Sequence, residues 1–153
     1  MLGDTDRLDI SLFDATGQLL TVVRGGGAPV PTTESDGRRW RREIVASFGP
    51  DMPDDFVERY QRAPYRDSYP AFEKVGVDTM GRLWLGTTVL MGDDERRWIV
   101  FDQAGGPVGS LKLPAAAEVL DITDDRLVTL HRDDLGVEEI TSYTVDGLEA
   151  GGR

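Results

Sequence analysis

Short stretches of alternating apolar and polar residues occupy most of the chain, and Gly and Asp separate them. The stretches are residues 8–14, 18–24, 73–77, 82–88, 97–102, 108–113, 118–122, 126–132 and 137–145. A period of two places successive side chains on opposite faces of a strand, while Gly and Asp favour the turns between strands. The pattern therefore predicts a mainly β protein built from short antiparallel strands.

The chain also repeats itself at a spacing of 42–44 residues. The segment WIVFDQAG at 98–105 aligns with ITSYTVDG at 140–147, and RLW at 82–84 aligns with RLV at 126–128. Repetition at this spacing is typical of architectures in which each unit is one four-stranded antiparallel sheet. We expect such a unit to be the building block of the fold.

The predicted strands fill these units unequally. Residues 70–114 supply all four strands, whereas residues 115–147 supply the first three and lack the fourth. Residues 7–24 supply a hairpin that corresponds to the last two strands of a unit. Residues 148–153 are expected to form a tail.

Two motifs carry a resemblance to a known family. The pattern D-x-x-G-x-L-W at 78–84, together with F-D-x-x-G at 101–105 and 13–17, resembles bacterial six-bladed β-propellers of the NHL-repeat and TolB-like kind. The resemblance implies four-stranded blades in a partial ring of about two and a half blades, the C-terminal portion of a longer parent that supplies the others. It also implies a periplasmic or exported parent, although this chain has no export signal of its own.

Residues 25–69 interrupt the repeat as a linker and a helical insertion. Trp40, Ile44 and Phe48 follow one another at intervals of four residues, which predicts an amphipathic helix over 38–48. A second helix is expected over 53–62, because proline suits the first helical position and acidic residues suit the first turn. We therefore expect one partial propeller domain over residues 1–153 with a short two-helix insertion.

Composition excludes several classes of function. The formal net charge of −11 argues against a nucleic-acid binder, whose surface should be basic. The chain has no cysteine, which excludes disulfides, thiol nucleophiles and thiolate metal sites. No apolar run approaches the roughly 20 residues that a transmembrane helix needs.

Residues that suggest chemistry are mostly explained by local structure. Asp14, Asp78 and Asp102 each precede a Gly turn, where an Asp side chain accepts hydrogen bonds from nearby backbone amides. The three glycines at 25–27 precede Ala-Pro-Val-Pro and not the helix that a phosphate-binding loop requires. We therefore expect these residues to be architectural.

The remaining candidates do not form a metal or catalytic site. His131 is the only histidine, so the chain cannot build a site from several imidazoles, and no serine lies in a nucleophile elbow. The acidic turns at 93–95 and 133–134 lack the ligand spacing of a calcium loop. We predict no catalytic residue, no metal ligand and no cofactor.

The insertion is the candidate binding region. It holds seven arginines against eight acids, a net charge of −1, while the rest of the chain carries −10. In a propeller the acidic turns at 93–95 and 133–134 emerge on the same side as the insertion, so we expect one face to combine them. These arginines either pair with the acidic turns or bind an anionic partner. The partner-binding candidates are Arg38, Arg39, Trp40, Arg42, Arg59, Asp93, Asp94, His131 and Asp133.

The leading hypothesis is a noncatalytic binding or scaffold propeller module whose partner is a protein, peptide or glycan. The alternative, taken from the same resemblance, is a hydrolase or lactonase with a metal in the central channel. The first strand of each unit would line that channel and would have to project several metal ligands. Here the first strands offer Glu73, Glu118 and Asp121.

Overall fold

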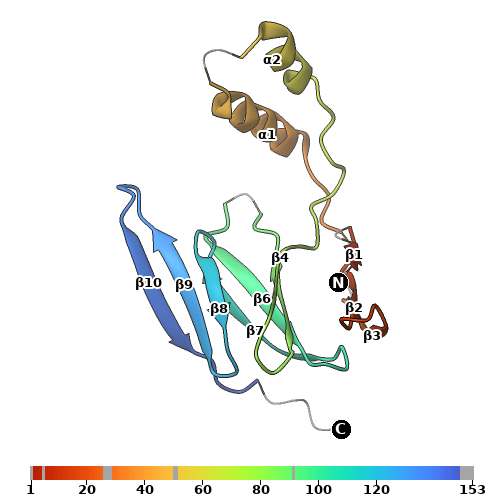
Figure 1. Cartoon of the computed structure of the whole chain (residues 1–153). Helices are drawn as coiled ribbons and strands as arrows, with labels where there is room; N and C mark the ends of the chain where they lie inside the picture. Colours follow the sequence, from red (N-terminus) through yellow and green to blue (C-terminus); the bar gives the residue numbers. More distant parts are fainter. Residues whose placement is uncertain (1, 5, 26–28, 50–51, 91, 149–153) are drawn as a thin grey trace. The chain divides into compact units, whose positions relative to one another are not determined.

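The computed structural model describes residues 2–4, 6–25, 29–49, 52–90 and 92–148 (Figure 1). It is mainly β, and it divides into two units. The sheet unit comprises residues 1–28 and 70–153, and the helical unit comprises residues 29–69. Each unit is described by itself.

The sheet unit contains three antiparallel sheets in which each strand pairs with the next along the chain. The first sheet consists of β1 (Leu2–Asp4), β2 (Asp9–Phe13) and β3 (Leu19–Arg24). The middle sheet consists of β4 (Phe72–Val77), β5 (Leu83–Thr87), β6 (Glu95–Phe101) and β7 (Pro107–Pro114). The third sheet consists of β8 (Glu118–Ile122), β9 (Arg126–Arg132) and β10 (Glu138–Thr144).

The predicted strands are confirmed, with ends that differ by at most two residues from the expected ones. The first sheet is the exception, because it is not a two-stranded hairpin. β1 adds a third strand, with Leu2 opposite Ser11 and Asp4 opposite Asp9. Three residues are too few for an alternating pattern to be recognised, so this strand could not be predicted from the pattern.

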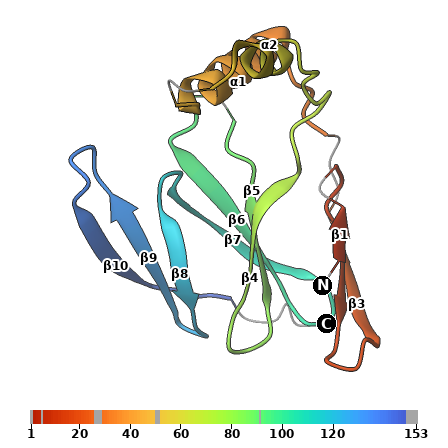
Figure 2. The same cartoon turned by 45° about the horizontal axis from the view of Figure 1, so that its top comes forward.

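The first and third sheets lie on either side of the middle sheet (Figure 2), and two hydrophobic clusters of the described residues join them to its opposite faces. One cluster joins Ile10 and Val23 of the first sheet to Leu83 and Leu85 of β5. The other places Trp84 of β5 against residues of the third sheet, among them Ile122 and Leu127. Because successive side chains of β5 point to opposite faces, its continuous apolar sequence is buried on both sides.

Two aromatic residues at equivalent positions in the repeat have different surroundings. Phe101 of β6 belongs to the cluster on the first-sheet side of the middle sheet. Tyr143, at the corresponding position of β10, is 37% exposed. β4 and β8 approach closely at Gly76, where an added Cβ would lie 2.8 Å from Cδ1 of Ile122.

One turn recurs in all three sheets. The turn has the sequence Asp-x-x-Gly and occurs at 14–17, 78–81, 102–105 and 133–136. Its glycine has a positive φ in every case, between 74° and 86°. In each turn the Gly amide donates to the Asp carbonyl at 3.0–3.1 Å, while the Asp side chain accepts from a later backbone amide. The prediction that Asp14, Asp78 and Asp102 cap turns is therefore confirmed.

Asp78 does more than cap its turn. Its Oδ1 accepts from the amides of Met80 and Arg82, while its Oδ2 accepts from Nε of Arg82 at 2.6 Å and Nε1 of Trp84 at 2.9 Å. Arg82 in turn donates to the carbonyls of Asp124 and Leu148, at 2.8 and 3.0 Å. One buried carboxylate thus links the β4–β5 turn, the core tryptophan and the third sheet.

The helical unit contains α1 (Glu34–Ser47) and α2 (Asp54–Gln61). α1 begins four residues before the predicted start, because Thr33 and Asp36 form a capping box ahead of the apolar stripe. The two ends of the helical unit are joined by a short antiparallel pairing between Pro31 and Ser68. Neither of the described helices is long and apolar enough to span a membrane.

Replacing Trp84 with alanine should lower the free energy of unfolding by about 3–5 kcal/mol, because it removes a fully buried indole and leaves a cavity. Urea denaturation of the full chain, followed by circular dichroism, measures the loss. Val77→Ala is the control on the neighbouring strand, since Val77 is 57% exposed. A loss below about 1 kcal/mol at Trp84 would contradict the packing described here.

The pKa of Asp78 is lowered: burial alone would raise it, but hydrogen bonds from Trp84 and Arg82 and the charge of Arg82 outweigh burial. The stability that this carboxylate contributes is present above the unfolded pKa of about 3.9, and it is lost as pH falls through the lower folded value. Asp78→Asn should cost about 1–3 kcal/mol at neutral pH, because the donors lose an acceptor.

The difference in unfolding free energy between the native chain and Asp78→Asn should shrink in acid, as the native carboxylate also becomes neutral. Urea denaturation at a series of pH values tests this expectation. Asp146→Asn, at an exposed position, is the control. A difference that stays constant down to acidic pH would show that the charge of Asp78 does not stabilise the fold.

Candidate functional site

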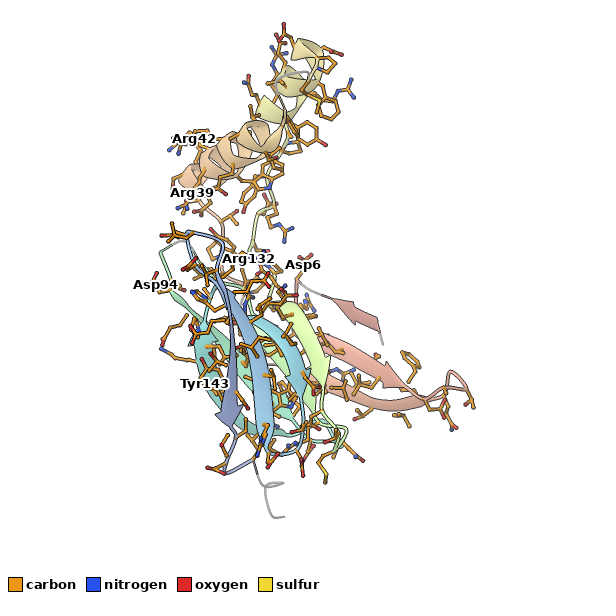
Figure 3. All side chains as sticks on the ribbon, turned by 60° about the vertical axis from the view of Figure 1, so that its left-hand side comes forward. Asp6, Arg39, Arg42, Asp94, Arg132 and Tyr143 are labelled. Atoms are coloured by element: carbon orange, nitrogen blue, oxygen red, sulfur yellow. The ribbon has the colours of Figure 1, made fainter. Side chains whose placement is uncertain are left out.

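The predicted partner-binding residues divide between the two units. Those of the helical unit lie on its helices, where Figure 3 labels Arg39 and Arg42 on α1. Those of the sheet unit lie in the β5–β6 and β9–β10 connections and at the end of β9. Both connections lie at the same end of the sheets (Figures 1 and 2). The candidates thus divide into two groups, one in each unit.

Several arginines of the helical unit already have an acidic partner one turn away. Arg38 pairs with Glu34 at 2.8 Å and Arg39 with Glu43 at 2.6 Å, both on α1. Arg62 pairs with Glu58 at 3.2 Å at the end of α2. The pKa of Arg39 is raised by its hydrogen bond to Glu43 and by the charge of that carboxylate. Local pairs therefore satisfy Arg38 and Arg39, two of the predicted binding residues.

Arg41 and Arg42 are in a different situation. They line a groove of about 380 Å³ whose other walls are Val45, Ala46 and Gln61, and which we call the α1–α2 groove. Nη1 of Arg41 donates to the carbonyl of Ala63 at 2.8 Å, just beyond α2. Among the described residues, neither arginine forms an ion pair. Arg41 was not among the predicted partner-binding residues, although its spacing carries a signal: the residues four positions away are Gly37 and Val45, not acids.

The predicted Trp40 belongs to the packing inside the helical unit. Its ring centroid lies 5.4 Å from that of Tyr65 in a tilted arrangement. Phe48, Phe56 and Tyr60 form a second aromatic cluster between the helices, with ring centroids 4.9–5.4 Å apart. Trp40 is therefore a packing residue that is half-buried, and it contributes to the rigidity of the unit.

A polar network fixes the two ends of the helical unit. Asp36 is buried, and its Oδ2 accepts from the amide of Thr33 at 2.6 Å and from its hydroxyl at 2.8 Å. Hydrogen bonds from Thr33 lower the pKa of Asp36. Burial and a hydrogen bond to Asp36 raise the pKa of Tyr69 to about 12. Thr33 precedes α1 and Tyr69 ends the unit, so the network connects its entry and exit.

The acidic connections of the sheet unit are largely engaged in structure. Oδ1 of Asp133 accepts from the amides of Leu135 and Val137, at 2.9 and 2.8 Å, which makes Asp133 a fourth turn-capping residue. The carbonyl of Asp94 accepts from the amide of Ala115 at 2.8 Å. A hollow of about 430 Å³ beside β6 combines both signs of charge, because its lining includes Asp93, Asp94, Arg97 and Lys112.

His131 lies near the end of β9, directly opposite Glu139 of β10. Its Nδ1 is buried and has no hydrogen-bond partner in the described part of the chain. Within that part, no group of three or more His, Asp or Glu side chains could hold a metal ion. The alternative hypothesis of a metal-dependent enzyme must therefore draw on other residues.

The first strands of the middle and third sheets border a groove of about 320 Å³. Lys74, Glu118 and Asp121 contribute its charged walls. Glu73, the third acid that the sequence analysis placed on these strands, does not line it and instead pairs with Nη1 of Arg96 at 3.0 Å. Oδ1 of Asp121 accepts from the amide of Ile122. Two of the three expected acids therefore share this groove.

No protein-family model, curated protein or solved structure matches the chain. The resemblance to six-bladed propellers accordingly stays a prediction from the sequence motifs.

The raised pKa of Tyr69 has a measurable consequence. Because the neutral phenol is favoured in the folded state, its contribution to stability is complete below the unfolded pKa of about 10 and is lost as pH rises towards about 12. Tyr69→Phe should remove the highest-pH step of the tyrosinate absorbance titration, whereas Tyr143→Phe, on the exposed strand β10, should retain it. Persistence of that step in Tyr69→Phe would contradict the assignment.

Proposed function

We propose that residues 7–24 and 70–147 are blades of a partial β-propeller of the six-bladed NHL-repeat or TolB-like kind. Three observations support this architecture: each sheet is an up-and-down meander, the sheets pack face to face, and the same Asp turn recurs in all of them. A blade of four antiparallel strands is the unit of a propeller. The middle sheet has that strand number and order.

The third sheet supports the same proposal, because an apolar residue of its outer strand β10 is exposed. Ile140 of β10 occupies the repeat position of Trp98 of β6, yet Ile140 is 67% exposed while Trp98 is 4% exposed. β6 is covered at its outer edge by β7, whereas β10 pairs with β9 alone among the described strands. A fourth strand, supplied by a longer parent chain along with further blades, would satisfy this edge.

The chain is, on this proposal, a noncatalytic binding or scaffold module for a protein, peptide or glycan partner. Two surfaces are the candidates for partner binding: the helical insertion in the helical unit, and the β5–β6 and β9–β10 connections in the sheet unit. This proposal is carried by the role of the candidate carboxylates, which stabilise turns. Each accepts hydrogen bonds from backbone amides of the same kind of turn: Asp14, Asp78, Asp102 and Asp133. The charges left for recognition are the exposed ones, such as Arg42, Arg59 and Asp93.

A second candidate is a hydrolase or lactonase with a metal in the central channel. The groove that β4 and β8 border favours it, because Glu118 and Asp121 both contribute to its walls. The described residues of this chain do not complete a ligand set there. Metal analysis of the purified intact protein by mass spectrometry separates the two candidates, since a stoichiometric metal would favour the enzyme.

Charge reversal on either proposed surface should abolish partner capture by the full chain without unfolding it. The first variant combines Arg42→Glu with Arg59→Glu, and the second combines Asp93→Lys with Asp94→Lys. Both should lose the partners that crosslinking and mass spectrometry identify for the native chain, while Tm stays nearly unchanged because exposed charges contribute little to stability.

The matched control combines Arg24→Glu with Arg126→Glu, which reverses two exposed arginines on β3 and β9. This control should retain capture. If both test variants retain it as well, the partner face lies elsewhere and the proposal is wrong.

A further inference from the structure

The α1–α2 groove is distinguished by its charge. Elsewhere on the two helices, Arg38, Arg39 and Arg62 each have a glutamate at hydrogen-bond distance. The groove has two guanidinium groups among its five lining residues and no carboxylate. Three other arginines of the helical unit are thus paired with glutamates, whereas this concave site is lined by two arginines without an ion pair among the described residues, which favours an anionic occupant.

The geometry of Arg41 prepares the site for that occupant. The carbonyl of Ala63 holds Nη1 of Arg41 at 2.8 Å, so the position of the guanidinium is fixed before anything binds. Gly37 contributes to this position, because a Cβ there would lie 3.2 Å from Cβ of Tyr65 and 3.4 Å from Nη2 of Arg41. A guanidinium whose position is fixed loses little side-chain entropy when it binds a carboxylate.

The other residues that line the α1–α2 groove differ from those of a simple ion site. Val45 and Ala46 add apolar surface beside the arginines, and Gln61 adds an amide that can both donate and accept hydrogen bonds. A volume of about 380 Å³ lies within the range of small-ligand sites and is far larger than a single carboxylate or phosphate needs. The occupant should therefore combine an anionic group with an apolar group and a polar backbone.

We infer that the α1–α2 groove binds an acidic peptide segment. Arg42 and Arg41 bind a carboxylate, Val45 and Ala46 contact an adjacent apolar side chain, and the amide of Gln61 bonds to the peptide backbone. This inference rests on the proposed function as a binding module, and it names the chemistry of the partner. Arginine is suited to the role because its planar fork matches a carboxylate with two parallel hydrogen bonds.

Fluorescence anisotropy with the full chain tests the inference. The probe is a short fluorescein-labelled peptide with the core Glu-Leu-Glu between glycines. The native chain should bind it saturably. Replacing Glu with Gln in the peptide, or Leu with Ser, should weaken binding about tenfold, because either change removes one half of the recognition.

The matched pair of protein variants is Arg42→Gln and Arg59→Gln. Both remove one charge from an exposed arginine of the helical unit, but only Arg42 lines the groove. Arg42→Gln should weaken peptide binding about tenfold, and Arg59→Gln by less than about twofold. Far-UV circular dichroism verifies that both variants keep their helices. Equal effects of the two variants would overturn the inference, because they would show attraction by overall charge alone.

One further outcome would also overturn it. Competition by inorganic phosphate at the same concentration as unlabelled peptide would show a general anion site.

The result is separable from the test of the proposed function. A chain that captures its partner but does not bind the peptide would overturn the acidic-peptide assignment alone. If the chain binds the peptide through Arg42 but both charge-reversed variants keep partner capture, the proposed function is wrong and the acidic-peptide assignment stands.

Discussion

The carboxylate of Asp78 is the interaction on which the sheet unit most depends. It accepts four hydrogen bonds, from two backbone amides, from Nε of Arg82 and from Nε1 of Trp84. By fixing Trp84 it determines which face of β5 each residue occupies, because successive side chains alternate. Leu83 and Leu85 then enter one cluster and Trp84 the other. The contacts from Arg82 to Asp124 and Leu148 extend this constraint to the third sheet.

The strands could be predicted because both of their signals, alternation and the Asp-x-x-Gly turn, are local in sequence. Which hydrophobic cluster a side chain enters depends on contacts that are distant in sequence. Phe101 and Tyr143 occupy equivalent positions in the repeat, yet one is buried against the first sheet and the other is exposed at an edge. The repeat fixes the position of a residue within its sheet, whereas burial depends on whether another sheet or strand lies beside it.

The candidate site could be predicted less well, for a related reason. Counting charges singled out the arginines around Trp40 but did not distinguish those with a partner from those without one. On a helix the residue four positions away decides this, and Glu43 pairs with Arg39 while no acid stands at that spacing from Arg42. Arg41 was missed because its role depends on Ala63, which lies 22 residues further along the chain.

The overall charge of the chain constrains how an arginine-lined groove can act. A net charge of −11 repels an acidic segment at long range, and residues outside 29–69 carry −10 of it. At physiological ionic strength this repulsion fades over about 8 Å, whereas a carboxylate in contact with two guanidinium groups is screened much less. Recognition by Arg41 and Arg42 would therefore be short-ranged. The long-range field would slow the encounter of an acidic partner with the chain, so the strength of binding would depend on slow dissociation from the fitted contact.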